Sequence, residues 1–154
     1  MAENLPPGYS RETTIRIDRD GRFWHDGQPV EHRGLQSAFS GWIDVDPESG
    51  RYILRNKIHW VFVEADDAPL VVQRVQPGAP PTLELSDGSS EPLAATTLRI
   101  DGDEVPYCDV RGGKLPARFS HSAAFTLGEW LLEHPEVQPA RVAAGQGAAR
   151  NRSV

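Results

Sequence analysis

The sequence predicts an α+β protein with two β-β-α units, at about residues 13–42 and 96–134, on either side of a strand-rich middle. The phrase TTIRID at residues 13–18 recurs as TTLRID at residues 96–101. Both copies are followed by a turn, a strand with an aromatic residue, a glycine turn, a basic residue and a helical pattern. The 14 Gly and 13 Pro residues favour short elements, so we expect small, mainly antiparallel sheets.

The first unit begins with a strand in which Ile15 and Ile17 alternate with polar residues, the period of a half-buried strand. An Asp-Gly turn follows, and RFWH reads as the returning strand. In HRGLQSAFSGW, Leu35 and Phe39 are spaced i,i+4, which predicts a short helix.

The middle of the chain is rich in predicted strands. WIDVDPESGRYIL predicts a hairpin whose loop covers residues 47–50. IHWVFVE, residues 58–64, is apolar on both faces, which predicts a central strand that is covered on both sides. LVVQRV and TLELSDG predict further strands on either side of the loop QPGAPP.

The second unit repeats this order. TTLRID and YCDV predict two strands, and KLPARF predicts a further short one. SHSAAFTLGEWLLEH predicts the longest helix of the chain, with Ser120 or Ser122 as its N-cap and Pro135 as its stop.

These elements predict a four-part organisation. Residues 1–10 are expected to be disordered, and residues 11–80 to form an N-terminal unit with the hairpin and the central strands. Residues 81–136 are expected to form a C-terminal unit that ends in the helix. The remaining residues, 137–154, are rich in small residues and predict a disordered tail.

Composition limits the function classes. A net charge of −6 argues against a general nucleic-acid binder, which needs a clustered positive field. The single cysteine, Cys108, excludes an internal disulfide and fits a reducing compartment. The first residues lack a secretory-signal pattern, and no apolar run approaches the roughly 18 residues that span a bilayer. We therefore predict a cytoplasmic protein with no membrane or nucleic-acid partner.

Three stretches carry a family resemblance: RIDRDGRFWHDGQPVEHRGLQSAFS, VEADDAPLVV and YCDVRGGKLPARFSHSAAFTL. They resemble a bacterial domain-of-unknown-function family, number twelve eighty-five, over about residues 13–134. The third stretch carries all the named residues of the family pattern Y-x-x-V-x-G-G-x-x-A-R-F, with one residue more between the Gly pair and Ala117, whereas in the second Ala65 intrudes and Leu70 replaces the usual Phe. The resemblance implies an α+β fold with structural repeats and no established activity, with a suggested role in ligand sensing or signalling.

A basic run leads into the predicted C-terminal helix. Arg111, Lys114, Arg118 and His121 precede or begin it, and a helix N-terminus favours an anion. The Gly-Gly-Lys at 112–114 is no phosphate loop, because the required Gly and hydroxyl positions hold other residues. Solvated charges are the plainer alternative, and Arg118 could pair instead with Asp101 or Asp109.

Two other groups could belong to a site. Glu64, Asp66 and Asp67 cluster beside Pro69, where acid/base work or cation binding competes with a simple Asp-rich turn. His25 beside Trp24 could line a cleft. The candidate ligand-binding residues are thus Trp24, His25, Asp66, Asp67, Arg111, Lys114, Arg118 and His121.

Catalytic signatures are missing from the sequence. The five His residues form no HxH or HExxH pair, so we expect no metal, and no cofactor motif follows a strand. No GxSxG elbow occurs, and Cys108 lies in a predicted strand, as a small buried apolar residue would. An enzyme with an acid/base pair drawn from Asp66, Asp67, His25 or His121 is the third hypothesis.

The first hypothesis is a ligand-binding or sensory and signalling module. Two units beside a small sheet would leave a cleft where the basic run and Trp24, Trp42 or Trp60 meet a small anionic ligand. The alternative is a protein-interaction or structural module, dimeric through exposed sheet faces, without a small-molecule ligand.

Overall fold

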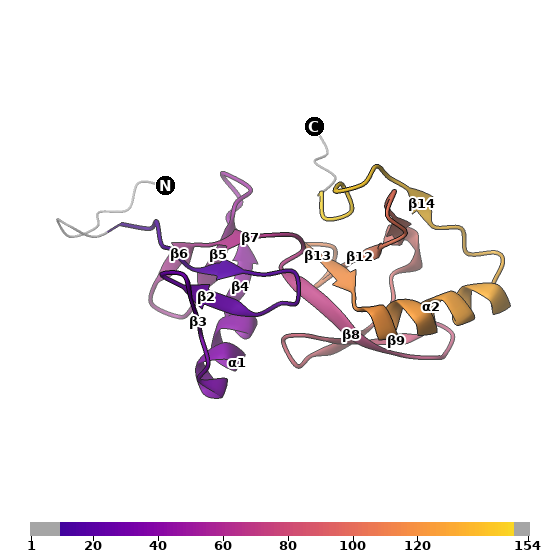
Figure 1. The fold of residues 1–154 in the computed structure, drawn as a ribbon, viewed down its shortest axis with the longest axis horizontal. Helices are drawn as coiled ribbons and strands as arrows, with labels where there is room; N and C mark the ends of the chain where they lie inside the picture. The colour runs from indigo at the N-terminus through magenta and orange to yellow at the C-terminus, as the bar shows by residue number, and fades with distance from the viewer. Residues whose placement is uncertain (1–9, 150–154) are drawn as a thin grey trace.

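The computed structural model describes residues 10–149, and in them strands greatly outnumber helices. The strands form three sheets, of four, seven and three strands, and the two α-helices lie in different halves of the molecule (Figure 1). The predicted α+β class is confirmed. The pairing is mainly antiparallel, as expected, but the largest sheet is larger than we predicted.

The N-terminal half holds the four-stranded and three-stranded sheets. The four-stranded sheet has the order β3-β2-β1-β7, and the other sheet the order β4-β5-β6. In the chain, α1 follows β3 and precedes β4. The elements are β1 (Arg16–Ile17), β2 (Phe23–His25), β3 (Gln28–Pro29), α1 (Arg33–Trp42), β4 (Ile43–Val45), β5 (Tyr52–Arg55), β6 (Trp60–Phe62) and β7 (Glu64–Ala65).

The C-terminal half is built on the seven-stranded sheet, in the order β10-β9-β8-β13-β12-β11-β14. β8 and β13 pair in parallel at its centre, and α2 contacts both of them. The elements are β8 (Leu70–Gln76), β9 (Thr82–Leu85), β10 (Ser90–Pro92), the 3-10 helix η1 (Ala95–Thr97), β11 (Arg99–Ile100), β12 (Pro106–Val110), β13 (Leu115–Phe119), α2 (His121–Glu133) and β14 (Ala140–Arg141).

Local chemistry sets the ends of both helices. The Ser120 side chain accepts a hydrogen bond from the backbone nitrogen of Ala123, so the predicted N-cap of α2 is confirmed. α2 ends two residues before Pro135. α1 is capped by the His32 imidazole, which accepts from the backbone nitrogen of Leu35 at 3.2 Å.

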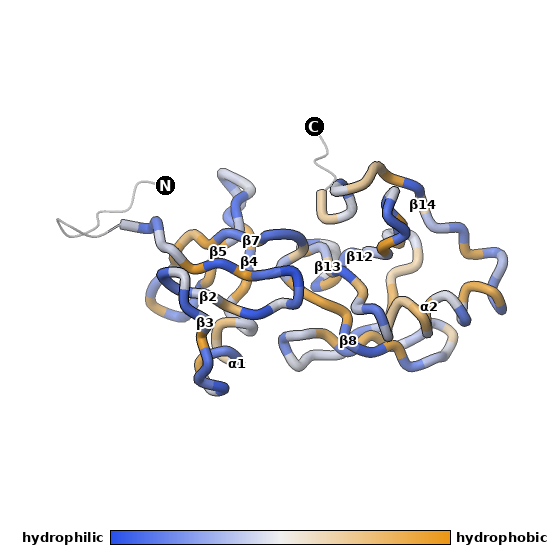
Figure 2. The backbone as a smooth tube through the Cα atoms, in the orientation of Figure 1, coloured by the Kyte–Doolittle hydropathy of each residue, from blue (hydrophilic) through white to orange (hydrophobic). Residues whose placement is uncertain are grey.

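One hydrophobic core runs through both halves. Phe23 of β2, Leu70 of β8 and Phe119 of β13 are each at most 1% exposed. Figure 2 shows the apolar stretch of β8 passing through the middle of the molecule. Complete burial of such side chains stabilises a fold by about 1.5–3 kcal/mol each, so this shared core stabilises both halves.

The recurring hexapeptide adopts the same local structure twice. β1 and β11 each pair antiparallel with the next strand and parallel with a later one, β7 or β14. The Oδ1 atoms of Asp18 and Asp101 each accept hydrogen bonds from the backbone nitrogens two and four residues further on. In the first unit three strands, not the predicted two, precede the helix, because β3 extends the meander, while in the second unit β13 confirms the further short strand predicted at KLPARF.

Three predictions about the middle of the chain are corrected. β8 pairs with β9 and β13, so residues 70–76 belong to the C-terminal sheet and not to the predicted unit 11–80. β6 is an edge strand and not a central one. The apolar run 58–64 changes sheet between β6 and β7, so its residues never share one buried strand, and Ile58 is 80% exposed in a turn.

The C-terminal segment, residues 140–149, is docked onto the second half. The backbone nitrogens of Ala140 and Val142 donate to Leu98 and Ile100 at 3.1 Å. Gly147 is buried, and its oxygen accepts from Nε of Arg99 at 2.7 Å. The predicted disordered tail is therefore wrong for this segment, while residues 150–154, and residues 1–9 of the predicted disordered N-terminus, lie outside the described residues.

Candidate functional site

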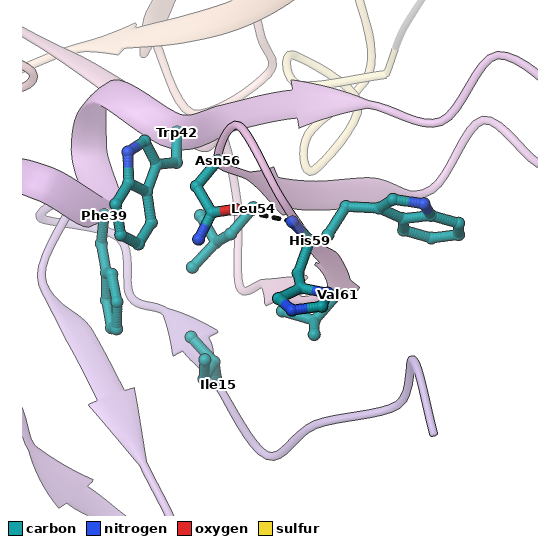
Figure 3. Close-up of a pocket in the computed structure, with 8 residues that line it drawn as sticks. Ile15, Phe39, Trp42, Leu54, Asn56, His59 and Val61 are labelled. Atoms are coloured by element: carbon teal, nitrogen blue, oxygen red, sulfur yellow. Dashed lines mark hydrogen bonds between the residues drawn. The ribbon is translucent and has the colours of Figure 1, made fainter. Parts of the chain in front are cut away.

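A cavity of about 100 Å³ lies between α1 and the β5–β6 hairpin. Its walls are mostly aromatic and aliphatic, and its polar groups come from the hairpin turn (Figure 3). Binding sites for small molecules typically combine an apolar interior with a few polar groups. The lining residues are Ile15, Phe39, Trp42, Leu54, Asn56, His59, Trp60 and Val61.

The apolar wall follows from two local periodicities. Phe39 and Trp42 are three residues apart on α1, so they project from one face, with ring centroids 5.8 Å apart. Phe39 is held from behind by an edge-on contact with the buried Phe23, at 5.4 Å between centroids. Leu54 and Val61 are directly paired across β5 and β6, which puts both on the same face of the sheet.

The polar rim is fixed by the turn between β5 and β6. Oδ1 of Asn56 accepts hydrogen bonds from the backbone nitrogens of Ile58 and His59, at 2.8 and 2.7 Å. Both donors need an oxygen as their acceptor, so the amide oxygen of Asn56 must face the turn. Its NH₂ group therefore points away from the turn. In Figure 3 the amide nitrogen of Asn56 points toward the space beside Trp42, and the His59 ring lies at the opposite edge of this space.

Cationic side chains lie near the cavity, and acidic ones are missing from its described lining. None of the described residues that line it is acidic. The Arg11 guanidinium lies 4.4 Å from the Trp60 ring centroid and donates to the Trp60 oxygen at 2.7 Å. Lys57 is exposed within the hairpin turn itself.

The predicted basic run does not form one cluster. Arg118 is 7% exposed and donates to the oxygens of Arg19 and Phe119, with Nε 3.7 Å from the Asp67 carboxylate. The alternative that Arg118 pairs with an aspartate is thus correct, but its partners are Asp67 and Asp20, whose Oδ1 lies 3.5 Å from Nη2. Asp101 instead caps its own turn, and Asp109 pairs with Arg99 at 3.0 Å.

Arg111 joins the second half to the first at another place. Its guanidinium donates to the oxygens of Ser40 and Ile43 and pairs with the Asp87 carboxylate, which is 4% exposed. Arg111 and Arg118 share no partner in the described residues. The charge of each arginine is balanced by a carboxylate of the protein itself.

The Asp87 carboxyl predicts a pH dependence of stability. Burial alone would raise its pKa, but hydrogen bonds from Ser89 and Arg111 outweigh burial and lower the pKa below its ordinary value. The ion pair therefore stabilises the fold fully above the unfolded pKa of about 3.9, and this contribution is lost as the pH falls through the lower folded value.

We expect Asp87→Asn to cost about 1.5–3 kcal/mol at pH 7, and this cost to shrink steadily below about pH 4. Urea denaturation from pH 3 to 7 measures it. Asp103→Asn, on an exposed turn, is the control and should show no such trend. A cost of Asp87→Asn that stays constant over this range would contradict the assignment.

The other predicted residues lie apart. Lys114 and His121 are exposed, and Lys114 lines a separate surface hollow with Arg55. Nε1 of Trp24 donates to Asp18 at 2.9 Å. The remaining three have partners close by: His25 beside Asp26, Asp66 in an ion pair with Arg16, and Asp67 accepting from the Tyr107 hydroxyl at 2.6 Å.

The structure brings Trp42 and Trp60 to the cavity, but not Trp24. Sequence reasoning missed Phe39, Asn56 and His59 as site residues. The i,i+3 pair Phe39 and Trp42 and the turn sequence NKIH between two strands were the available signals. Neither shows by itself that the helix faces the turn.

Other chemistry is not favoured by the described residues. Burial raises the pKa of Cys108 to about 12, so its thiol stays neutral and unreactive. Among residues 10–149, no three His, Cys, Asp or Glu side chains gather as a metal site. Within the same residues, no helix is long and apolar enough to cross a membrane.

A second hollow, of about 500 Å³, lies where the two halves meet. It is wider than the aromatic cavity, but polar groups dominate its lining. These are Asp20, Arg22, Gln36, Ser37, Ser40, Gln73, Ser86 and Asp87, with Gly21 and Gly88. Because it offers little apolar surface to a ligand, we favour the aromatic cavity as the site.

No model of a known protein family and no curated protein matches the chain. Two solved structures do. A protein from Silicibacter pomeroyi DSS-3 is 25% identical over 77% of this chain and 69% of its own, with a TM-score of 0.64. One from Shewanella baltica OS155 is 15% identical over 79% of this chain and 94% of its own, also with a TM-score of 0.64. Both are DUF1285 family proteins.

These neighbours agree with the family that the sequence resembles. The second is too distant in sequence to show more than the fold. The family of both is known by a number, which names no ligand or activity. The comparisons therefore support the α+β fold, and the function must be argued from the site.

Proposed function

We propose that this protein is a small-molecule-binding module whose aromatic cavity holds the apolar part of the ligand. The observation that carries the proposal is the pairing of a rigid apolar wall, Phe39 and Trp42 on α1, with a polar turn on the opposite side. Membership of the DUF1285 family, a sensory or signalling role and a cytoplasmic location are parts of the same proposal. The likeness to two structures of that family supports the first of these.

The size of the cavity limits the ligand. About 100 Å³ accommodates one ring or one branched aliphatic group, but not a nucleotide. Burial of a ring of about 150 Å² at about 25 cal/mol per Å² contributes roughly 4 kcal/mol before the costs of association. We therefore expect affinities of about a millimolar Kd for fragments held by the ring alone.

The internal repeat gives this site a structural context. We propose that β1-β2-β3-α1 and β11-β12-β13-α2 are copies of one unit. Shared strand pairings and the matching turns at Asp18 and Asp101 support this. In the first copy the β4–β5–β6 sheet is inserted before the parallel strand β7, and the cavity lies between that insertion and α1.

Ring-bearing fragments should raise the melting temperature of the wild-type protein. At about 100 times Kd, ligand linkage is worth about 2.7 kcal/mol, or about 5–10 °C for a chain of this length. Val61→Phe should abolish the shift, because the added ring fills the cavity from the edge strand β6. Differential scanning fluorimetry with a fragment panel, followed by tryptophan fluorescence titration, measures both effects.

Lys57→Ala, in the exposed turn but outside the cavity, is the matched control for folding and for nonspecific binding. A panel in which no fragment stabilises the wild-type protein would refute the proposal. Equal binding to Val61→Phe would place the ligand elsewhere.

A protein-interaction module is the second candidate, favoured by exposed apolar side chains on α2. Phe125 and Leu132 are 72% and 85% exposed and lie on one face of the helix. This face would bury them in a dimer or against a partner. If the protein sediments as a strict monomer at high concentration, the hypothesis of a dimer is excluded.

A further inference from the structure

At the rim of the aromatic cavity, the free part of the Asn56 amide offers hydrogen-bond donors only. The Asn56 amide must direct its NH₂ group away from the turn, because its oxygen already binds two backbone N–H groups. In Figure 3 this nitrogen and the His59 ring lie on two sides of the cavity mouth. A ligand group that meets the Asn56 NH₂ group must accept hydrogen bonds, and the His59 ring can donate a second one.

The charges around the mouth favour an anion over a neutral acceptor. Lys57 belongs to the same turn as Asn56 and His59, and its side chain is exposed. Among the described lining residues none is acidic, so a carboxylate meets no repulsion from the walls. Charge-assisted hydrogen bonds are roughly twice as strong as neutral ones.

Resting on the proposed function of this cavity, we infer that its ligand is a small ring-bearing carboxylate. The ring contacts Phe39, Trp42 and Val61, and the carboxylate accepts hydrogen bonds from Nδ2 of Asn56 and from the His59 ring. This assigns a role to the turn sequence NKIH. It places the anion site away from the basic run at Arg111 and Arg118, whose charges are used within the fold.

The test uses three ligands of similar size that are negative, neutral and positive at neutral pH: phenylacetate, 2-phenylethanol and 2-phenylethylamine. Isothermal titration calorimetry with the full chain should show phenylacetate binding about tenfold more tightly than the alcohol, and the amine most weakly. The alcohol reports the apolar part of the site alone.

Asn56→Asp is the decisive variant. A carboxylate keeps the oxygen that accepts from Ile58 and His59, so the turn is retained, but it replaces the NH₂ donor with a negative oxygen. The preference for phenylacetate over the alcohol should disappear. Lys57→Ala controls for a general loss of positive charge and should reduce the preference only slightly.

The outcomes separate the two proposals. Equal binding of the acid and the alcohol, or a preference that survives Asn56→Asp, overturns the inference and leaves the cavity as an apolar binding site. If no ligand binds the wild-type chain in the cavity, both the proposed function and this inference are overturned.

Discussion

Replacing Arg118 with methionine is expected to destabilise the protein by about 3–5 kcal/mol. Methionine retains the aliphatic stem but removes the guanidinium that binds the Arg19 oxygen and lies beside Asp67. The Asp67 side chain is only 8% exposed, so its charge would stay buried with less compensation. Urea denaturation at pH 7 measures the loss.

Two further variants identify the cause. Lys114→Met, on an exposed turn of the same hairpin, should change the stability by less than about 0.5 kcal/mol. In the Arg118→Met background, Asp67→Asn should restore part of the loss, because it removes the uncompensated charge. A loss below about 1 kcal/mol for Arg118→Met would show that this contact does not join the halves.

Gly147→Ala is expected to release the C-terminal segment from the second half. A Cβ atom at this position would overlap the Tyr107 ring, and the overlap cannot be relieved because that ring is buried and its hydroxyl is bound to Asp67. We expect a loss of about 1–3 kcal/mol, the usual range for overpacking. Hydrogen exchange of the Ala140 and Val142 amides should accelerate by about tenfold or more.

Gln146→Ala, exposed in the same segment, is the control and should leave both amides protected. Trypsin cleavage at Arg141 provides a second readout, since that side chain is exposed and paired only with Glu104 in the described residues. Unchanged exchange in Gly147→Ala would mean that the strand pairing of β14 holds the segment without Gly147.

The elements that the sequence predicted well depend on neighbours in the chain. The α2 helix begins at its Ser120 cap, and the β4–β5 hairpin turns where Pro47 and Gly50 lie. Asp18 and Asp101 bind their own turns, so the recurring hexapeptide produces the same structure twice. Each of these features is completed within a few residues.

The predicted site residues show where local reasoning stops. Arg111 and Arg118 were predicted to bind an anion, because the sequence shows no partner for their charges close by in the chain. Their partners, Asp87 and Asp67, come from distant parts of the chain. In the same way the small residues after position 137 suggested disorder, whereas Gly147 is buried against Tyr107 because only glycine fits there.

By itself, the sequence determined the α+β class, both helices, the hairpin and the recurring strand-turn-strand. The tertiary structure alone decided that β8 joins the C-terminal sheet, that Arg111 and Arg118 bind backbone oxygens of the first half and that α1 faces the Asn56 turn to form a cavity. The physical reason is the range of the interactions. Caps, turns and periodicity act over a few residues, whereas ion pairs, sheet order and cavities depend on segments that meet only after the chain has folded.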